Sequence, residues 1–190
     1  RLISFTQKNF GPQMVNLFIK GEDVTPYIGD KLGVPDKFVR KATEIIPMAL
    51  LPARMNPRLA RGGFRLTRGR TTLAAWVSGL PIVMLTTTGA RTGQPRTHPV
   101  LALPDGNSLV VIGSNFGRPQ HPGWYYNLRV HPEAVVTWEG SAVEMHAREL
   151  KGDERERYLA RSHQSYPWWE PYHRRAAPRQ VPVIMLEPGA

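Results

Sequence analysis

The spacing of apolar and polar residues follows two patterns along the chain, and the first gives way to the second near residue 80. Before it, apolar residues recur at helical spacing over residues 36–51, and Asp36 stands where a residue caps a first helical turn. We therefore expect one amphipathic helix there, within an N-terminal extension of helices and loops over residues 1–70. The helix would bury Phe38, Ala42, Ile45, Ile46 and Ala49.

After residue 80 the pattern becomes one of strands and turns. Residues 82–88 are apolar and β-branched, a composition typical of a buried strand. Pro104-Asp105-Gly106-Asn107 predicts a tight hairpin, and His131-Pro132 predicts a helix end. We expect strands at 82–88, 96–103, 108–113, 133–138, 142–150 and 181–187, and helices at 123–130 and 152–165.

This order of elements predicts an α+β fold with a small antiparallel barrel over residues 71–190. A chain of 190 residues fits one such domain with an appendage. The longest apolar runs are far shorter than the roughly 20 residues that span a bilayer, so no transmembrane helix is expected. The sequence begins at Arg1 without Met and shows no signal peptide.

Cysteine is absent, which excludes disulfides, thiolate nucleophiles and Cys-ligated metal centres. The expected location is the cytoplasm. His121 precedes a proline in a loop and no second ligand stands at metal-binding spacing, so we assign no metal.

Positive charge is concentrated in the middle of the chain. Residues 45–132 contain ten arginines and one acidic residue, Asp105, whereas the segments on either side are nearly balanced. Such a field attracts anions, and guanidinium groups favour forked contacts with phosphate or carboxylate. The partner could be nucleic acid, an anionic membrane or a polyanionic small molecule.

Six of these arginines lie within residues 54–70, around Gly62-Gly63. The stretch is either a solvated connector or a segment that lies on anionic lipid or against an acidic cofactor tail. Peripheral contact with the inner face of the cell membrane is therefore a further prediction.

The turn at residues 89–94 joins two predicted strands and contains two glycines, Arg91 and Thr92. It can direct backbone amides and a guanidinium toward a phosphate, or it can be an ordinary hairpin in which glycine supplies positive φ angles. The Gly-Lys-Ser/Thr ending and following helix of a P-loop are missing.

Aromatic residues form two clusters, which either pack in the core or provide flat walls for a planar ring. The first is Trp124-Tyr125-Tyr126; the second comprises Tyr166, Trp168, Trp169 and Tyr172.

Several short motifs follow one another in a characteristic order. They are Leu85-Thr86-Thr87-Thr88-Gly89, Gly93-Gln94-Pro95-Arg96, Ser114-Asn115, His121-Pro122-Gly123-Trp124-Tyr125-Tyr126-Asn127-Leu128, and Pro132. In order and spacing the chain resembles the deazaflavin-dependent nitroreductase and quinone reductase family over residues 80–188.

The resemblance implies a split β-barrel that binds reduced coenzyme F420, a deazaflavin whose tail carries a phosphodiester and several carboxylates. It implies hydride transfer to a small electrophilic acceptor, such as a quinone, an enone or a nitro compound. It places Tyr166, Trp169 and Tyr172 beside the acceptor, which Tyr166 or Tyr172 would orient. We expect Ser114 to hydrogen-bond either the acceptor or the ring carbonyl, and these four residues are the candidate catalytic residues. The resemblance assigns cofactor binding to Ala90, Arg91, Thr92, Arg96, Thr97, His98, Pro99, Val100, Leu101, Ile112, Gly113, Ser114, Asn115, Gly123, Trp124, Tyr125, Tyr126 and Asn127.

Two positions depart from the family pattern. Ala90-Arg91 stands where two cations are common, and Trp169 stands where a tyrosine is usual, so an indole replaces a phenol that could donate a proton. Other possibilities stay open, namely an FMN-binding oxidoreductase of the same fold, a cofactor carrier without turnover, and a nucleic-acid-binding module. No nucleic-acid motif is present, so no nucleic-acid partner is expected. The oligomeric state is not predicted.

Overall fold

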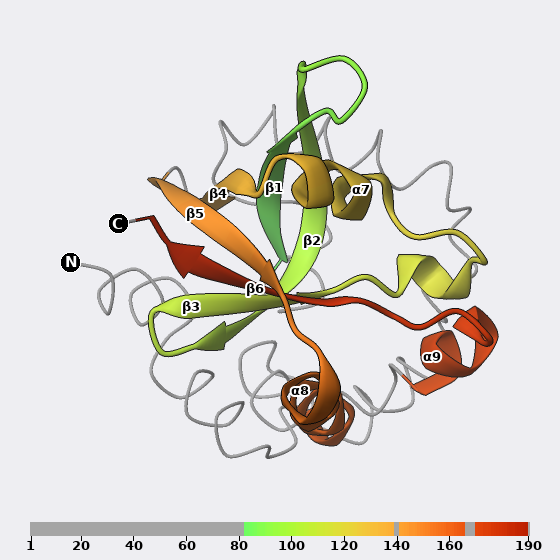
Figure 1. The fold of residues 1–190 in the computed structure, drawn as a ribbon. Coiled ribbons are helices and arrows are strands. Elements are labelled where there is room, and N and C mark those ends of the chain that lie inside the picture. The colour runs from blue at the N-terminus through green and yellow to red at the C-terminus, as the bar shows by residue number, and fades with distance from the viewer. Residues whose placement is uncertain (1–81, 139–140, 166–169, 190) are drawn as a thin grey trace, which may run out of the picture.

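The computed structural model describes residues 82–138, 141–165 and 170–189 (Figure 1). The helix expected over residues 36–51, the arginine-rich stretch 54–70, and Tyr166, Trp168 and Trp169 lie outside the described residues. Within the described ranges no helix is both long and apolar enough to cross a membrane.

Six antiparallel strands close into a barrel in the order β1-β2-β3-β6-β5-β4 (Figure 1). Consecutive strands are neighbours except β3 and β4, because β3 pairs with β6 and β4 closes the barrel against β1. The strands are β1 (Ile82–Thr88), β2 (Pro95–Asp105), β3 (Ser108–Ile112), β4 (Glu133–Trp138), β5 (Ser141–Glu149) and β6 (Val183–Pro188).

Alternation of side chains along each strand fills the barrel. Residues directly opposite one another in an antiparallel pair share a face. Leu85 lies opposite His98 on one side and Val136 on the other, and Val83 lies opposite Val100. Because Val83, Leu85 and Val136 are fully buried, this face is the interior, as in other small barrels filled by side chains.

Helices cover the barrel at its two ends (Figure 1). The helix α7 (Gly123–Val130) packs beside β1 below the β1–β2 turn. A single 3-10 turn, η1 (Asn115–Gly117), lies beside α9 (Glu170–Ala176). Of the helices in the described ranges, the longest is α8 (Gly152–Ser165), which lies at the opposite end from the turn.

The helix α8 is tied to the β2–β3 hairpin by a polar contact. The Tyr158 hydroxyl donates a hydrogen bond to the Asp105 carboxylate, and Arg161 pairs with the same carboxylate at 3.5 Å. Burial, together with the bond to Asp105, raises the pKa of Tyr158 to about 12. The phenol therefore stays protonated and keeps this hydrogen bond at all physiological pH values.

The α+β split-barrel prediction is confirmed, and most element bounds agree within two residues. The strand at residues 82–88 and the helices at 123–130 and 152–165 have the predicted limits. The helix α9 was not predicted, because its seven residues are mostly polar and include Pro171, so they show no apolar periodicity.

Glycine is required where α9 packs against η1. Asn115, Phe116 and Gly117 have φ angles of 49°, 56° and 73°, three successive left-handed residues. A Cβ at Gly117 would lie 2.6 Å from the Cβ of Arg175 and 3.1 Å from the carbonyl oxygen of Tyr172. This close approach brings α9 against the segment that contains Ser114.

We predict that Gly117→Ala destabilises the fold more than Gly106→Ala, which serves as the matched control. Gly106 also has a positive φ, 58°, but open space surrounds the position of its Cβ. The control should lose about 1–2 kcal/mol of unfolding free energy through the left-handed backbone alone. Gly117→Ala should lose about 1–3 kcal/mol more through overpacking. Urea unfolding measures both, and equal losses would contradict the packing of α9 described above.

Candidate functional site

The β1–β2 turn is held in one conformation by its own backbone. The Gly89 amide donates to the Gln94 carbonyl at 2.9 Å, and the Gly93 amide donates to the Gly89 carbonyl at 2.8 Å. Gly93 has a φ of 64°, which suits glycine. The turn therefore presents its side chains from a rigid base.

Asn127 fastens this turn to α7. Its Oδ1 accepts a hydrogen bond from the Ala90 amide at 3.0 Å, and its Nδ2 donates to Thr87 Oγ1 at 2.9 Å. Thr87 is 1% exposed, so this bond satisfies a hydroxyl that water does not reach. The structure thus brings together three predicted elements, namely the turn, the end of β1 and the His121 to Leu128 motif.

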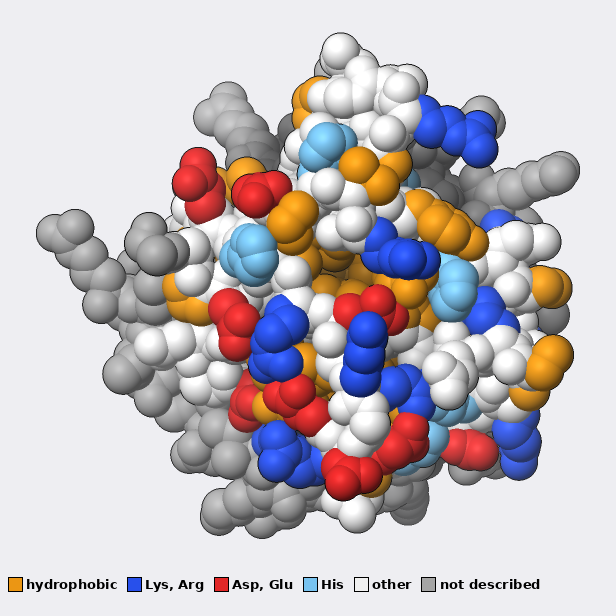
Figure 2. Space-filling model, in the orientation of Figure 1, with side chains coloured by type: hydrophobic (Ala, Val, Ile, Leu, Met, Phe, Trp, Pro, Cys, Tyr) orange, Lys and Arg blue, Asp and Glu red, His pale blue; other side chains and the backbone are white. Residues whose placement is uncertain are grey.

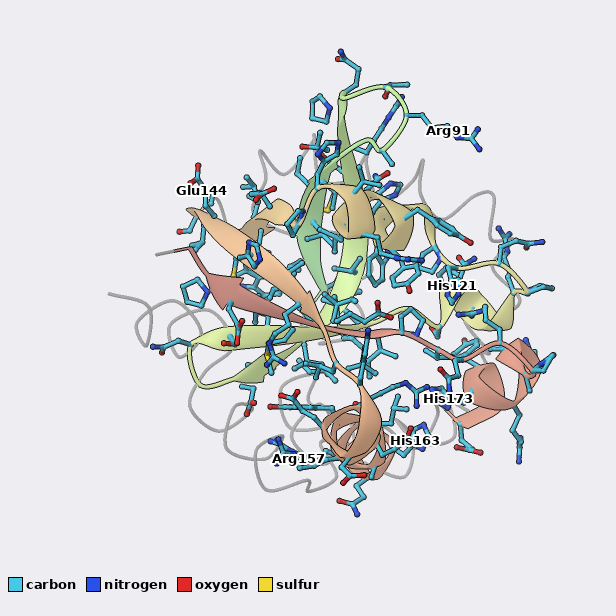
Figure 3. All side chains as sticks on the ribbon, in the orientation of Figure 1. Arg91, His121, Glu144, Arg157, His163 and His173 are labelled. Atoms are coloured by element: carbon cyan, nitrogen blue, oxygen red, sulfur yellow. The ribbon has the colours of Figure 1, made fainter. Side chains whose placement is uncertain are left out.

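Arg91 on the turn and Arg96, the second residue of β2, are both exposed, and neither has an acidic partner among the described residues. Figure 3 shows Arg91 pointing away from the barrel on the side where His121 also lies. In Figure 2 this upper right part of the face displays basic and histidine side chains, whereas the visible acidic side chains lie to the left and below. The β1–β2 turn, α7 and the Ser114 loop, here called the rim, therefore carry exposed positive charge, which attracts anions in general.

The five predicted residues on β2 divide between two faces. His98 and Val100 pair with interior residues of β1, whereas Thr97, Pro99 and Leu101 pair with Thr86, Met84 and Ile82 on the outer face. Because alternate strand residues point to opposite sides, one pocket wall can use only one of these sets. Cofactor contact by this stretch stays a prediction for each set.

The aromatic residues of α7 differ sharply in exposure. Trp124 and Tyr125 are both 6% exposed and belong to the core, whereas Tyr126 is 46% exposed. The Tyr125 hydroxyl donates to Glu149 Oε1 at 3.0 Å. Burial first, and then this bond, raises the pKa of Tyr125. Tyr126 is therefore the aromatic face that α7 leaves open to a ligand.

The predicted residues that follow β3 also divide by burial. Ile112 is in the core, and Gly113 lies so close to Pro182 that a Cβ would come within 2.6 Å of it. Ser114 and Asn115 are half-buried, and Tyr172 on α9 reaches this segment. Its ring stacks edge-on against Phe116 with centroids 6.3 Å apart. The structure thus brings Ser114 and Tyr172 into one neighbourhood, whereas Tyr166 and Trp169 lie outside the described residues.

Sequence reasoning missed Arg179, which precedes β6 and organises the loop that contains Ser114. Its guanidinium donates to the carbonyl oxygens of Gly113 at 3.1 Å, Ser114 at 2.8 Å and Arg118 at 3.2 Å. It also contacts His121 Nδ1 at 3.1 Å. No local motif marks Arg179, because its partners lie some sixty positions earlier in the chain.

A pair of histidines lies where α8 meets α9. The rings of His163 and His173 are 4.7 Å apart and nearly perpendicular, and His163 Nδ1 lies 3.4 Å from Glu170 Oε2 (Figure 3). Burial, and then the neighbouring His163, lowers the pKa of His173. Within the described ranges no group of three or more His, Cys, Asp or Glu side chains is arranged to hold a metal ion.

A closed antiparallel barrel with an arginine-bearing turn, an exposed tyrosine and a half-buried serine at one end defines an α+β split-barrel protein. A family model described as F420H(2)-dependent quinone reductase matches residues 59–188, and the chain belongs to that family. The resemblance inferred from the motifs is thus confirmed.

Individual relatives agree with this family. An F420H(2)-dependent quinone reductase of Mycobacterium tuberculosis (strain H37Rv) is 38% identical over 80 residues, which cover 42% of this chain and 52% of the relative. The chain thus spans about half the length of the curated relatives it matches first.

Solved structures share the fold. A structure of an F420-H2 dependent reductase is 33% identical, covers 56% of this chain and 94% of its own, and has a TM-score of 0.51. A second, described as a domain-swapped dimer, is 29% identical, covers 80% of this chain and 98% of its own, and has a TM-score of 0.53.

We predict that Asn127→Ala loosens the β1–β2 turn. The substitution removes both hydrogen bonds of the amide and leaves Thr87 Oγ1 and the Ala90 amide without those partners. The expected loss of unfolding free energy is about 1–3 kcal/mol. Amide exchange at Ala90 should accelerate as well. Asn107→Ala, at the exposed tip of the β2–β3 hairpin, is the control and should change stability by less than about 0.5 kcal/mol.

We also predict that acidification weakens the fold through His173. Its pKa is lowered below 6.5 in the folded state, so the unfolded chain binds the proton more readily. The stabilisation is complete above pH 6.5 and is lost as the pH falls through the lower folded value. His173→Gln should flatten the dependence of unfolding free energy on pH below 6.5. An unchanged slope in His173→Gln would contradict this assignment.

Proposed function

We propose that the chain binds reduced coenzyme F420 at the rim formed by the β1–β2 turn, α7 and the Ser114 loop, and that it reduces a quinone-type acceptor there. The observation that carries this proposal is the turn itself, where Arg91 and Arg96 stand exposed and without acidic neighbours while Asn127 fixes their base. Membership of the family and the name of the curated quinone reductase support the choice of cofactor and acceptor.

The residues at the rim fit a ligand with a phosphorylated, carboxylated tail. Two guanidinium groups can form charge-assisted hydrogen bonds with phosphate or carboxylate oxygens. The Arg91 backbone amide, which has no acceptor among the described residues, adds a donor at the tip of the turn. Asp105 is the single acidic residue between positions 89 and 132, and Tyr158 and Arg161 bind it away from this rim. Glu149 lies near α7, where Tyr125 donates a hydrogen bond to it, and neither arginine at the turn forms an ion pair with it.

Tyr126 and Ser114 are the residues that we expect to contact the ring end of the ligand. The open face of Tyr126 can stack against a planar ring, and the Ser114 hydroxyl, which has no hydrogen-bond partner in the described parts of the chain, can bind an acceptor oxygen. When bound, the reduced deazaflavin supplies a hydride, and the chain's own task is to orient the acceptor and exclude water.

The acceptor is a quinone in this proposal, and enones and nitro compounds remain further candidates with the same need for an oxygen-binding donor. Tyr172 beside Phe116 can orient such an acceptor from the α9 side. Tyr166 and Trp169 keep their proposed roles in acceptor contact, although both lie outside the described residues.

Three alternative functions predict different results when the protein is titrated with ligands. An FMN-binding oxidoreductase needs fewer cations, because FMN has a single phosphate. A carrier would bind the deazaflavin without turnover, and a nucleic-acid module would bind single strands in a salt-sensitive manner. Contact with an anionic membrane remains a prediction based on the arginines of residues 54–70, which the structure does not describe.

We predict that Arg91→Ala weakens deazaflavin binding while leaving the barrel folded. The loss of one charge-assisted contact of 1.5–3 kcal/mol corresponds to a roughly 10- to 150-fold rise in Kd. Arg91 is exposed, so circular dichroism and thermal unfolding should be unchanged. The measurement is a fluorescence titration of the purified protein with oxidised coenzyme F420, followed by oxidation of the reduced coenzyme with a naphthoquinone.

Arg157→Ala is the matched control, because Arg157 is an exposed arginine on α8 at the opposite end of the barrel (Figure 3). It carries the same change of net charge and should leave Kd nearly unchanged. Equal weakening by both variants would indicate attraction by overall charge rather than a site at the turn. Binding of FMN in preference to the deazaflavin would contradict the proposed function.

A further inference from the structure

His121 lies in the same loop as Ser114, and its ring is fixed on several sides. It packs against Tyr125 with centroids 4.6 Å apart and against Tyr126 with centroids 5.8 Å apart. Arg179 Nη1 contacts its Nδ1 at 3.1 Å. A histidine that is free on the surface has none of these contacts. The orientation of the His121 ring is therefore fixed by its neighbours at the rim.

The contact with Arg179 determines where the proton on His121 resides. A guanidinium has five N–H donors and no acceptor, so the hydrogen bond forms only if His121 Nδ1 is unprotonated. The imidazole is then neutral, with its single N–H on Nε2. Burial first, and then Arg179, lowers the pKa of His121, with Glu149 opposing and Arg129 assisting. The ring therefore stays neutral at neutral pH.

The Nε2–H that results is an unused donor. It has no hydrogen-bond partner within the described ranges, and it is not among the buried polar atoms that lack one, so a ligand can reach it. The guanidinium that holds the ring also binds the Ser114 carbonyl at 2.8 Å. The Arg179 guanidinium thereby holds both the Ser114 backbone and the His121 ring. The His121 ring lies beside the exposed ring of Tyr126.

We propose that His121 binds a carbonyl oxygen through its Nε2–H, and that Arg179 is the positioning residue that holds the imidazole in this tautomer. The oxygen belongs either to the ring system of the cofactor or to the quinone acceptor, since both present carbonyl groups of the same chemistry. A neutral donor suits an oxygen that gains negative charge on reduction. This inference rests on the proposed function, and it adds a residue to the site that binds the reacting rings.

Nitrogen NMR of the imidazole tests the tautomer without any ligand. In the ¹⁵N-labelled protein we expect His121 Nδ1 to resonate as an unprotonated nitrogen and Nε2 as a protonated one. In Arg179→Met this preference should be lost, and the pKa of His121 should rise toward 6.5. Arg174→Met on the exposed side of α9 is the control and should leave the spectrum unchanged. A proton on Nδ1 in the unmodified protein overturns the proposal.

Two substitutions at His121 test the roles of Nδ1 and Nε2 one at a time. They remain informative even if Arg179→Met does not fold. Asparagine places an oxygen near the Nδ1 position, so His121→Asn keeps the contact with Arg179 and removes the outer donor. Glutamine places an amide near the Nε2 position, so His121→Gln keeps the outer donor. We expect binding to weaken roughly 3- to 10-fold in His121→Asn, the value of one neutral hydrogen bond, and much less in His121→Gln.

Two measurements distinguish the source of the oxygen. A rise in Kd for oxidised coenzyme F420 in His121→Asn assigns the contact to the cofactor, whereas a rise in KM for the naphthoquinone with unchanged Kd assigns it to the acceptor. If neither value changes while the unmodified protein binds the coenzyme, this inference fails and the proposed function stands. If the unmodified protein does not bind the coenzyme, both fail.

Discussion

The pairing of β1 along both of its edges is the constraint on which the candidate site depends. All seven residues of β1 pair with β2, and Met84 to Thr87 pair with β4 on the other side. A strand held in this way cannot slide without breaking two ladders, so the position of its last residues is fixed. The turn with Arg91 continues directly from Thr88, and the buried hydroxyl of Thr87 anchors α7 through Asn127. The closure of the barrel is thus also the means by which charge is placed at its rim.

The two ends of the barrel are held by different kinds of contact. At the far end, Tyr158 and Asp105 form a part-buried polar clamp between α8 and a hairpin. At the rim, the Asn127 amide and the Arg179 guanidinium form several hydrogen bonds beside the apolar packing of α7. The surface of the rim around Arg91 and Tyr126 is exposed. Multiple hydrogen bonds from Asn127 and Arg179 give it rigidity without covering it.

Much of the barrel could be predicted because its signals are local. β-branched residues identified β1, and the prolines around α7 identified both of its ends. The exposure of each aromatic on α7 could not be predicted, since three consecutive aromatics differ only by rotation around the helix axis. The role of Arg179 was equally hidden, because it depends on carbonyl groups and a ring that the fold brings together from distant positions. The positively charged turn was predicted from charge and glycine spacing, and its freedom from acidic neighbours required the structure.

Three of the four contacts made by Arg179 are with main-chain oxygens, which every amino acid possesses. Apart from Gly113 and Gly117, where a Cβ would clash, the contacts of Arg179 with the loop between Gly113 and Arg118 do not depend on which side chains occupy it. Related chains could exchange residues such as Ser114 or Phe116 during evolution and still present the replacements at the same place. Divergence in the molecules that such proteins reduce would then proceed by substitution on an unchanged scaffold, without a new loop having to be built.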